Sequence, residues 1–345
     1  MLTAHGRARF LDTTSLRVGD ETFVGKHVVI AAGARHAPLG IPGEEHLTTS
    51  TGFLELDELP RRVVFVGGGY IAFEFAHIAA SAGAAVTILH RGERPLEGFD
   101  PDLVAQLLQT TRDLGVDVHL RTSVTAVDRR ADGLVVHASS GEGRIEVAAD
   151  LVVHAAGRIP EIDDLDLDAA GVARAGSGGV AVNDYLQSVS NPSVYAAGDA
   201  AASGGLPLTP VAGMQGRIVA ANLLNGNSHT PDYTGIPTVV FTTPPLARVG
   251  LDEAQAHARG LRFTTRHEDT STWYSSRRVA LAHTGFKTLV EDDSELILGA
   301  HLLGPHAEET INIFALAIRT GLRAPDLKDT VFAYPTSASD IRYTL

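Results

Sequence analysis

The stretch V-V-F-V-G-G-G-Y-I-A-F-E-F-A, residues 63–76, decides the fold. Its apolar start predicts a buried strand, its three glycines a tight turn, and its remainder a helix over about 71–82. A G-x-G-x-x-A motif lies at this junction, formed by Gly67, Gly69 and Ala72. The first glycine allows the turn, the second lets a pyrophosphate approach the backbone, and the small third residue lets helix and strand pack closely. The stretch predicts a dinucleotide site at a helix start, and a glycine-rich turn without a ligand is the alternative.

The residues after the next predicted strand, 85–89, bear on the choice between NAD and NADP. An acidic residue there would bond the ribose 2′-hydroxyl of NAD, but His90 occupies that place. Arg91 and Arg94 follow, and guanidinium groups bind a 2′-phosphate through charge-assisted hydrogen bonds. This pattern favours NADP. Alternatively, both arginines are solvated surface cations and Glu93 takes the role of the acid, so NAD stays possible.

Composition and charge exclude several classes of function. The chain has 345 residues, a net charge of −13 and no cysteine. The acidic balance argues against nucleic acid or an anionic membrane as the main partner. No apolar run approaches the roughly 20 residues of a membrane span, so a cytoplasmic location is expected. Without cysteine, this chain can contain neither disulfides nor thiol catalysis.

The pattern along the chain predicts an α/β protein. Residues 62–157 alternate strands with helices, which predicts a parallel sheet with helices on both faces. A β-meander is expected over 123–147 within this region. Two turns are expected in the meander, at Asp132-Gly133 and Gly141-Glu142-Gly143. From about 235 onward, antiparallel strands with helical patterns at 252–259 and 307–321 predict a separate α+β domain.

Several motifs in the same order resemble the pyridine nucleotide–disulfide oxidoreductases, the family of glutathione reductase, mercuric reductase and dihydrolipoamide dehydrogenase. The resemblance covers essentially the whole chain. The matching segments are Gly67–Ala72 with Glu74, His27–Gly33 with Pro42-Gly43, Ala156–Pro160, Val194–Asp199, Leu208–Ala212, and Val239–Pro245 with Val249–Leu251. It implies a Rossmann-like NAD(P) domain (61–157) inserted in a partial FAD-binding domain (1–60 and 158–232), followed by a dimerisation domain (235–345).

The resemblance also implies roles for individual residues. The FAD site would involve Gly33, Gly198, Asp199, Thr209 and Ala212, and Gly157 would be a further cofactor-binding residue. Asp199 would accept hydrogen bonds from the flavin ribityl chain, and the helix start at 208–212 would stabilise the reduced flavin. Tyr70 would cover the nicotinamide pocket, with Glu74 one helical turn further. Residues 235–345 would form a homodimer.

Three departures from the family pattern limit these expectations. The family's first strand–glycine turn–helix unit and its redox-active cysteine pair have no counterpart here, so we expect the chain to start inside the FAD domain. Dithiol exchange by this chain is chemically impossible. In place of the family's H-P-T-x-x-E-E, the tail reads Tyr334-Pro335-Thr336-Ser337-Ala338-Ser339-Asp340.

Tyr334 therefore stands where the family has an acid–base histidine. With a pKa near 10, a tyrosine is a poor general base, although it could donate a proton or a hydrogen bond. The alternative is that Tyr334 is a packed interface aromatic. None of the 15 histidines forms a metal-binding spacing backed by a carboxylate, so no metal site is expected.

Together, these observations predict an FAD-dependent NAD(P)H oxidoreductase. NADPH would donate hydride to the flavin, and a small-molecule acceptor would take the electrons. The candidate catalytic residues are Tyr70, Glu74 and Tyr334. The alternative is an inactive nucleotide-binding and dimerising fragment that needs a further amino-terminal segment.

Overall fold

The computed structural model describes residues 2–141 and 143–345. Its contacts divide the chain into two compact units. Unit 1 consists of Met1–Ala37 and Gly157–Tyr233, and unit 2 of Pro38–Ala156 and Thr234–Leu345. Residues 38–60 therefore lie in the same unit as the glycine turn. The four-domain division itself stays a prediction.

A four-stranded parallel sheet carries the glycine turn in unit 2. Its strand order is β12 (Leu151–His154), β6 (Arg62–Val66), β7 (Ala85–Leu89) and β8 (Asp117–His119). Two helices follow β6 and β7, namely α2 (Tyr70–Ser81) and α3 (Pro101–Asp113). The prediction of strand, turn and helix at residues 63–76 is confirmed. The preceding segment contributes η1 (Glu44–His46) and α1 (Ser50–Leu54).

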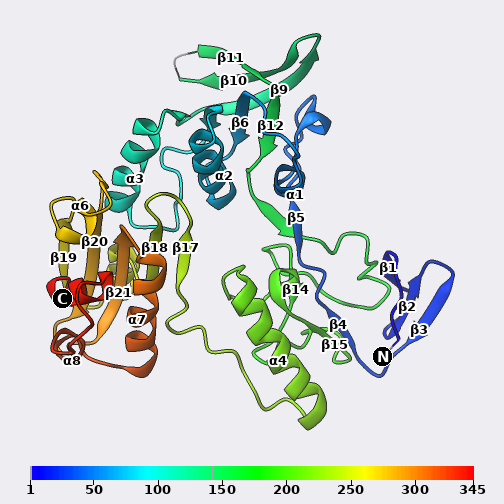
Figure 1. Cartoon of the computed structure of the whole chain (residues 1–345). Helices are drawn as coiled ribbons and strands as arrows, with labels where there is room; N and C mark the ends of the chain where they lie inside the picture. The colour runs from blue at the N-terminus through cyan, green and yellow to red at the C-terminus, as the bar shows by residue number, and fades with distance from the viewer. Residues whose placement is uncertain (1, 142) are drawn as a thin grey trace. The chain divides into compact units, whose positions relative to one another are not determined.

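Successive residues of β6 face different layers, because side chains alternate across a strand. Val63 and Phe65 pack in one core with α2 and α3. Val64 and Val66 pack in another core with the meander. The meander consists of β9 (Ser123–Arg130), β10 (Gly133–Ser140) and β11 (Gly143–Ala149), and Figure 1 shows it on the side of β6 opposite to α2. The expectation of helices on both faces is therefore wrong.

The two predicted meander turns have different outcomes. β9 and β10 are joined at Ala131-Asp132, next to the predicted Asp132-Gly133 signal. The second turn, Gly141-Glu142-Gly143, includes Glu142, which lies outside the described residues.

The tail forms a second sheet in unit 2, with all neighbours antiparallel. Its order is β17 (Thr238–Val240), β18 (Leu246–Gly250), β21 (Ile297–Leu303), β20 (Gly285–Glu291) and β19 (Phe263–Asp269). The accompanying helices are α5 (Glu253–Ala258), α6 (Tyr274–Arg277), α7 (Ala307–Thr320), α8 (Ala324–Lys328) and η3 (Ser337–Tyr343). Helix α7 packs its buried face on this sheet. The predicted antiparallel tail with helices near 252–259 and 307–321 is confirmed.

Unit 1 is built from short ladders and one long helix. Its strands are β1 (Ala8–Phe10), β2 (Ser15–Val18), β3 (Glu21–Val24), β4 (Val28–Ile30), β5 (Ala34–His36), β13 (Arg158–Pro160), β14 (Val180–Ala181), β15 (Val194–Ala196) and β16 (Ala201–Ala202). Strand β4 pairs in parallel with β15, and β5 pairs antiparallel with β13. The helices are η2 (Gly198–Ala200), which follows β15, and α4 (Thr209–Asn225), which follows β16.

None of the described helices could span a membrane. Over residues 2–141 and 143–345, every helix is too short or too polar to cross a bilayer.

Candidate nucleotide and flavin sites

Gly67 makes the turn that ends β6. Its φ of +128° lies in the region that side chains rarely adopt. Its N–H donates to the carbonyl of Leu89 at 2.9 Å, which ties the turn to the end of β7. A Cβ at this position would lie 2.1 Å from the carbonyl oxygen of Ala155. Both the backbone angle and the close approach of β12 therefore demand glycine here.

Gly69 is different, because the space beside it is open. Its φ of −97° and ψ of −162° suit any residue, and a Cβ would meet no atom within 4 Å. Gly69 is the N-cap of the 12-residue helix α2, and no side chain caps that helix. Ala72, fully buried, lets the first turn of α2 pack on the sheet. An uncapped helix start beside open space suits a pyrophosphate group, which free N–H groups and the helix dipole attract.

The ring of His90 covers the middle glycine of the turn. A Cβ on Gly68 would lie 2.5 Å from Nδ1 of His90, so only glycine fits under the ring. The other ring nitrogen, Nε2, lies 3.0 Å from the carbonyl oxygen of Arg94. His90 is thus part of the turn's own packing.

The charged residues beyond β7 are held to different degrees. Arg94 donates to the carbonyls of Phe99 at 2.8 Å and Glu97 at 3.1 Å. Glu93 forms an exposed ion pair of 3.1 Å with Arg121, and such pairs contribute little to stability. Arg91 is exposed and makes no hydrogen bond or ion pair with the described residues. Of the two arginines predicted to bind the 2′-phosphate, Arg91 is the one whose guanidinium has no partner among the described residues.

Tyr70 and Glu74 lie one turn apart on α2 and both contact the start of the tail sheet. The hydroxyls of Tyr70 and Thr238 share a hydrogen bond of 2.9 Å. The backbone N–H of Phe241 donates to Oε1 of Glu74 at 3.0 Å. Burial raises the pKa of the Glu74 carboxyl, and the hydrogen bond from Phe241 partly offsets that rise. These contacts anchor α2 to β17, while the predicted roles beside the nicotinamide stay predictions.

His77 extends this contact by one more turn and was not predicted as a site residue. The N–H of Thr243 donates to its Nδ1 at 3.2 Å, and its Nε2 lies 2.9 Å from the hydroxyl of Thr111. That hydroxyl donates to the carbonyl of Leu107, so it accepts from Nε2–H and the ring is neutral. The spacing of Tyr70, Glu74 and His77 on an otherwise apolar helix could have revealed their common face.

Removing the Tyr70 hydroxyl tests this anchor. We expect Tyr70→Phe to lower the free energy of unfolding by about 1 kcal/mol, because Thr238 loses its hydrogen-bond partner. Urea denaturation measures the change. Thr238→Val should cost a similar amount, and the double variant should cost less than the sum. Strictly additive losses would show that the two hydroxyls do not interact.

In unit 1, Gly33 and Gly157 precede the paired strands β5 and β13. Both have positive φ, +71° and +110°, and a Cβ on either would meet nothing within 4 Å. The N–H of Glu161 donates to the carbonyl of Gly33 at 2.9 Å, and that of Ala37 to Gly157 at 3.0 Å. The two glycine turns therefore lie at one short ladder and leave backbone open beside it, which suits a bound cofactor.

The remaining flavin candidates lie around η2 and α4. Gly198 has a φ of +70°, and its N–H donates at 2.7 Å to Oε1 of Gln215, a buried residue of α4. A Cβ on Gly198 would lie 3.2 Å from Cβ of Ala212, so the turn and α4 touch. Asp199 follows in η2, and α4 starts at Thr209 without a side-chain cap. A carboxylate beside an uncapped helix start fits the predicted polar contacts to a flavin.

The tail residues in the modified family motif are placed differently from one another. Tyr334 is 80% exposed, and within the described residues no hydrogen bond or ring contact joins it to Tyr70 or Glu74. Asp340 is half-buried at a cavity of about 60 Å³ that Trp273 also lines. Burial raises the pKa of the Asp340 carboxyl. The catalytic role of Tyr334 stays a prediction.

Three carboxylates gather in unit 2 where the sequence indicated no metal site. Within the described part of the chain, Asp100, Asp102 and Glu253 offer oxygens within 4.8 Å of one another. The Nζ atom of Lys287 lies among them at 2.5–2.9 Å. An ammonium group therefore supplies the positive charge at this position.

Comparison with known protein families assigns both parts of the chain. Residues 3–216 match the family model described as pyridine nucleotide-disulphide oxidoreductase. Residues 236–344 match the dimerisation domain of the same family.

Individual relatives agree with this assignment. Glutathione reductase of Nostoc sp. is 33% identical over 97% of this chain and 75% of its own length. Mercuric reductase of Staphylococcus aureus is 32% identical over 98% of this chain and 61% of its own length. The Cu(II) complex of RclA, an HOCl-induced flavoprotein disulfide reductase from Escherichia coli, superposes with a TM-score of 0.88 at 31% identity, over 98% of this chain and 77% of that one. This chain therefore belongs to the pyridine nucleotide-disulphide oxidoreductase family, whose members use FAD and NAD(P)H, and it carries the family's dimerisation domain.

Proposed function

We propose that this chain is an FAD-dependent NAD(P)H oxidoreductase that prefers NADPH and passes electrons to a small-molecule acceptor without a dithiol of its own. The observation that carries the proposal is the uncapped start of α2 behind Gly69, where a side chain would meet open space. That geometry provides N–H donors and room for a pyrophosphate. We further propose a homodimer through residues 235–345, which belong to the dimerisation domain.

Different residues of the chain bind the nicotinamide nucleotide and the flavin. In unit 2, the turn at Gly67–Gly69 receives the pyrophosphate and Arg91 the 2′-phosphate. In unit 1, Asp199 and the start of α4 hold the flavin side. Bound FAD supplies a two-electron carrier that accepts hydride from NADPH and passes the electrons on to the acceptor.

The proposed small-molecule acceptor takes its electrons from the flavin directly, because no cysteine is present to relay them through a reactive disulfide. Similar proteins include a mercuric reductase and a flavoprotein disulfide reductase whose structure is that of a Cu(II) complex. Metal ions, quinones and oxygen are therefore the acceptor classes to assay.

The visible spectrum of the purified chain, after incubation with FAD and removal of excess, tests the proposal. We expect flavin absorption bands, bleaching on addition of NADPH under nitrogen, and recovery of the bands when an acceptor is added. A colourless protein that still binds NADPH would refute the flavin part. It would favour the nucleotide-binding, dimerising fragment as the function.

The nucleotide preference is tested by Arg91→Glu. We expect the ratio of NADPH to NADH affinity to fall by about tenfold or more, because a carboxylate would repel the 2′-phosphate. Fluorescence titration with each nucleotide measures the ratio. Arg94→Gln is the matched comparison: its guanidinium holds carbonyls of the loop, so it should weaken both nucleotides alike. An unchanged ratio in Arg91→Glu would remove Arg91 from this role.

A further inference from the structure

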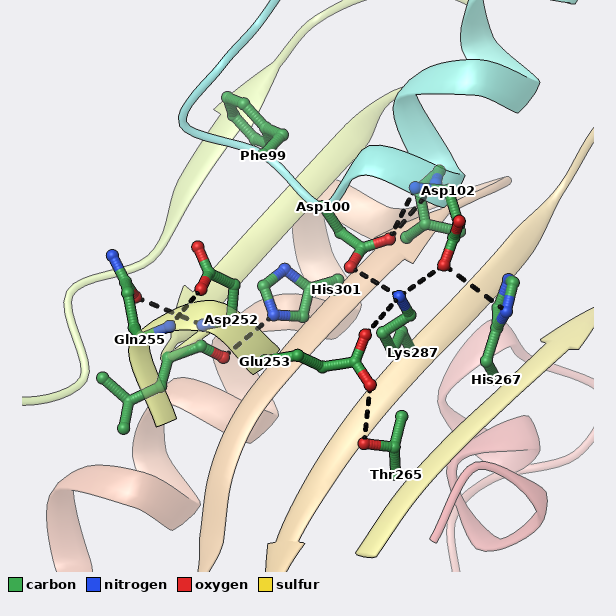
Figure 2. A network of polar contacts seen from close by, with 12 residues as sticks. Phe99, Asp100, Asp102, Asp252, Glu253, Gln255, Thr265, His267, Lys287 and His301 are labelled. Carbon is green, nitrogen blue, oxygen red and sulfur yellow. Dashed lines mark hydrogen bonds and ion pairs between the residues drawn. The ribbon is translucent and has the colours of Figure 1, made fainter. Parts of the chain in front are cut away.

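Lys287 is a buried lysine in the middle of an apolar strand. It belongs to β20 and is 2% exposed. Its Nζ lies 2.9 Å from Oδ2 of Asp100, 2.5 Å from Oδ2 of Asp102 and 2.9 Å from Oε2 of Glu253 (Figure 2). Two of these carboxylates stand at the start of α3 beside the parallel sheet, and the third stands on α5 in the tail. One ammonium group therefore joins the nucleotide-binding region to the dimerisation domain.

The surrounding carboxylates favour the charged form of the Lys287 side chain. Burial on its own lowers the pKa of Lys287, but the ion pair with Asp100 and the hydrogen bonds to Asp102 and Glu253 outweigh burial and raise it. The three carboxylates differ in exposure. The Asp100 side chain is 1% exposed, whereas those of Asp102 and Glu253 are 52% and 40% exposed. Water can solvate the two outer carboxylates if the lysine is lost. The buried Asp100 carboxylate has no such substitute, so its dependence on Lys287 is the strongest.

Asp100 also starts helix α3. Its Oδ1 accepts hydrogen bonds from the N–H groups of Asp102 at 3.0 Å and Leu103 at 3.3 Å. Its other oxygen, Oδ2, is the one paired with Lys287. The two N–H groups and the ion pair with Lys287 together orient the capping carboxylate, and with it the point at which the preceding loop enters α3.

That loop leads back to the glycine turn. The N–H of Leu96 donates to the carbonyl of Gly68 at 2.9 Å. The carbonyl of Phe99 accepts from Arg94 at 2.8 Å. The Phe99 ring packs edge-on against Tyr70, with ring centroids 5.5 Å apart. A continuous set of contacts thus runs from the turn, through residues 94–99, to Asp100.

We propose that Lys287 is a positioning residue for the dinucleotide site: by holding Asp100, it fixes the 94–100 loop against the glycine turn. It acts without touching the nucleotide. The inference rests on the proposed nucleotide binding at Gly67–Gly69. It adds a residue of the dimerisation domain to those that determine the affinity for the nucleotide.

The test compares Lys287→Met with the wild-type full chain. We expect hydrogen exchange of residues 94–104 to accelerate in the nucleotide-free protein, while β6 and β21 keep their protection. We expect the dissociation constant for NADPH to rise about tenfold. Glu253→Gln, which neutralises a partner whose side chain is 40% exposed, should change affinity less than about threefold.

Asp100→Asn keeps the proposal testable if Lys287→Met does not fold. Its amide oxygen can still cap α3, but it offers no charge to the lysine. We expect it to weaken NADPH binding as Lys287→Met does. Where both variants fold, the double variant should be no weaker than either single one, because each breaks the same pair.

Two results would overturn the proposal. One is NADPH affinity equal to wild type in Asp100→Asn, or in folded Lys287→Met. The other is unchanged exchange of residues 94–104. Wild-type protein that fails to bind NADPH would instead refute the proposed nucleotide binding, and the exchange measurement would still decide whether Lys287 holds the loop.

Discussion

Gly69→Ala should fold like the wild-type protein and lose affinity for NADPH and NADH by about tenfold or more, equivalent to about 1.4 kcal/mol of binding free energy or more. The backbone angles at Gly69 suit alanine, and the added methyl group would meet no protein atom within 4 Å. The methyl group would project into the open space at the start of α2 that we assign to the pyrophosphate. Titration calorimetry measures the affinity, and circular dichroism with thermal melting verifies the fold.

Gly67→Ala is the matched comparison two residues away. There the added Cβ would lie 2.1 Å from the carbonyl oxygen of Ala155, and φ is +128°. We expect this variant to misfold or to melt at a much lower temperature, so its loss of binding follows from a loss of structure. The pair separates the space for the ligand from the space for the turn. Wild-type affinity in Gly69→Ala would show that the open space is not the pyrophosphate site.

Acidification from pH 6.5 to about 4 should destabilise the protein by about 3 kcal/mol through His77 alone. Burial lowers the pKa of His77 to about 4 from its ordinary 6.5. Below pH 6.5 the unfolded chain therefore gains a proton that the folded chain refuses. Well above pH 6.5 the His77 ring is neutral in both the folded and the unfolded chain, so the free energy of unfolding has its full value. That free energy falls as the pH is lowered toward 4.

Comparing the wild-type protein with His77→Gln isolates this effect from that of the carboxylates. Glutamine can reproduce one or both of the hydrogen bonds to Thr243 and Thr111 but does not titrate. We expect urea denaturation to show a much smaller loss for His77→Gln over the same pH range. His5→Gln, at an exposed position, should keep the wild-type slope. Parallel pH profiles for all three proteins would show that His77 does not govern the acid response.

The sequence pattern alone was sufficient to predict secondary structure where neighbouring residues define it. The run of apolar residues in β6 and the glycines after it predicted the strand, the turn and α2, because propensity and burial agree there. The face opposite α2 was not predictable in the same way. Val64 and Val66 show that this face is buried, but helices and a β-meander can both cover it. The meander was recognised in the sequence, yet the layer to which it belongs is a long-range property.

The same distinction applies to the site. The sequence identified Gly67 and Gly69, because the glycine turn between a strand and a helix is a local pattern. The partners of Tyr70 and Glu74 lie about 170 residues away in the chain, so no local pattern could identify them. Lys287 does carry a local signal, because a lysine within the apolar strand G-F-K-T-L-V must find carboxylate partners or leave the core.

Titration of the purified wild-type chain with NADPH and with NADH tests the central claim most directly. The account predicts saturable binding at one site per chain by calorimetry, tighter for NADPH than for NADH. Absence of both heat and fluorescence change with either nucleotide would contradict it.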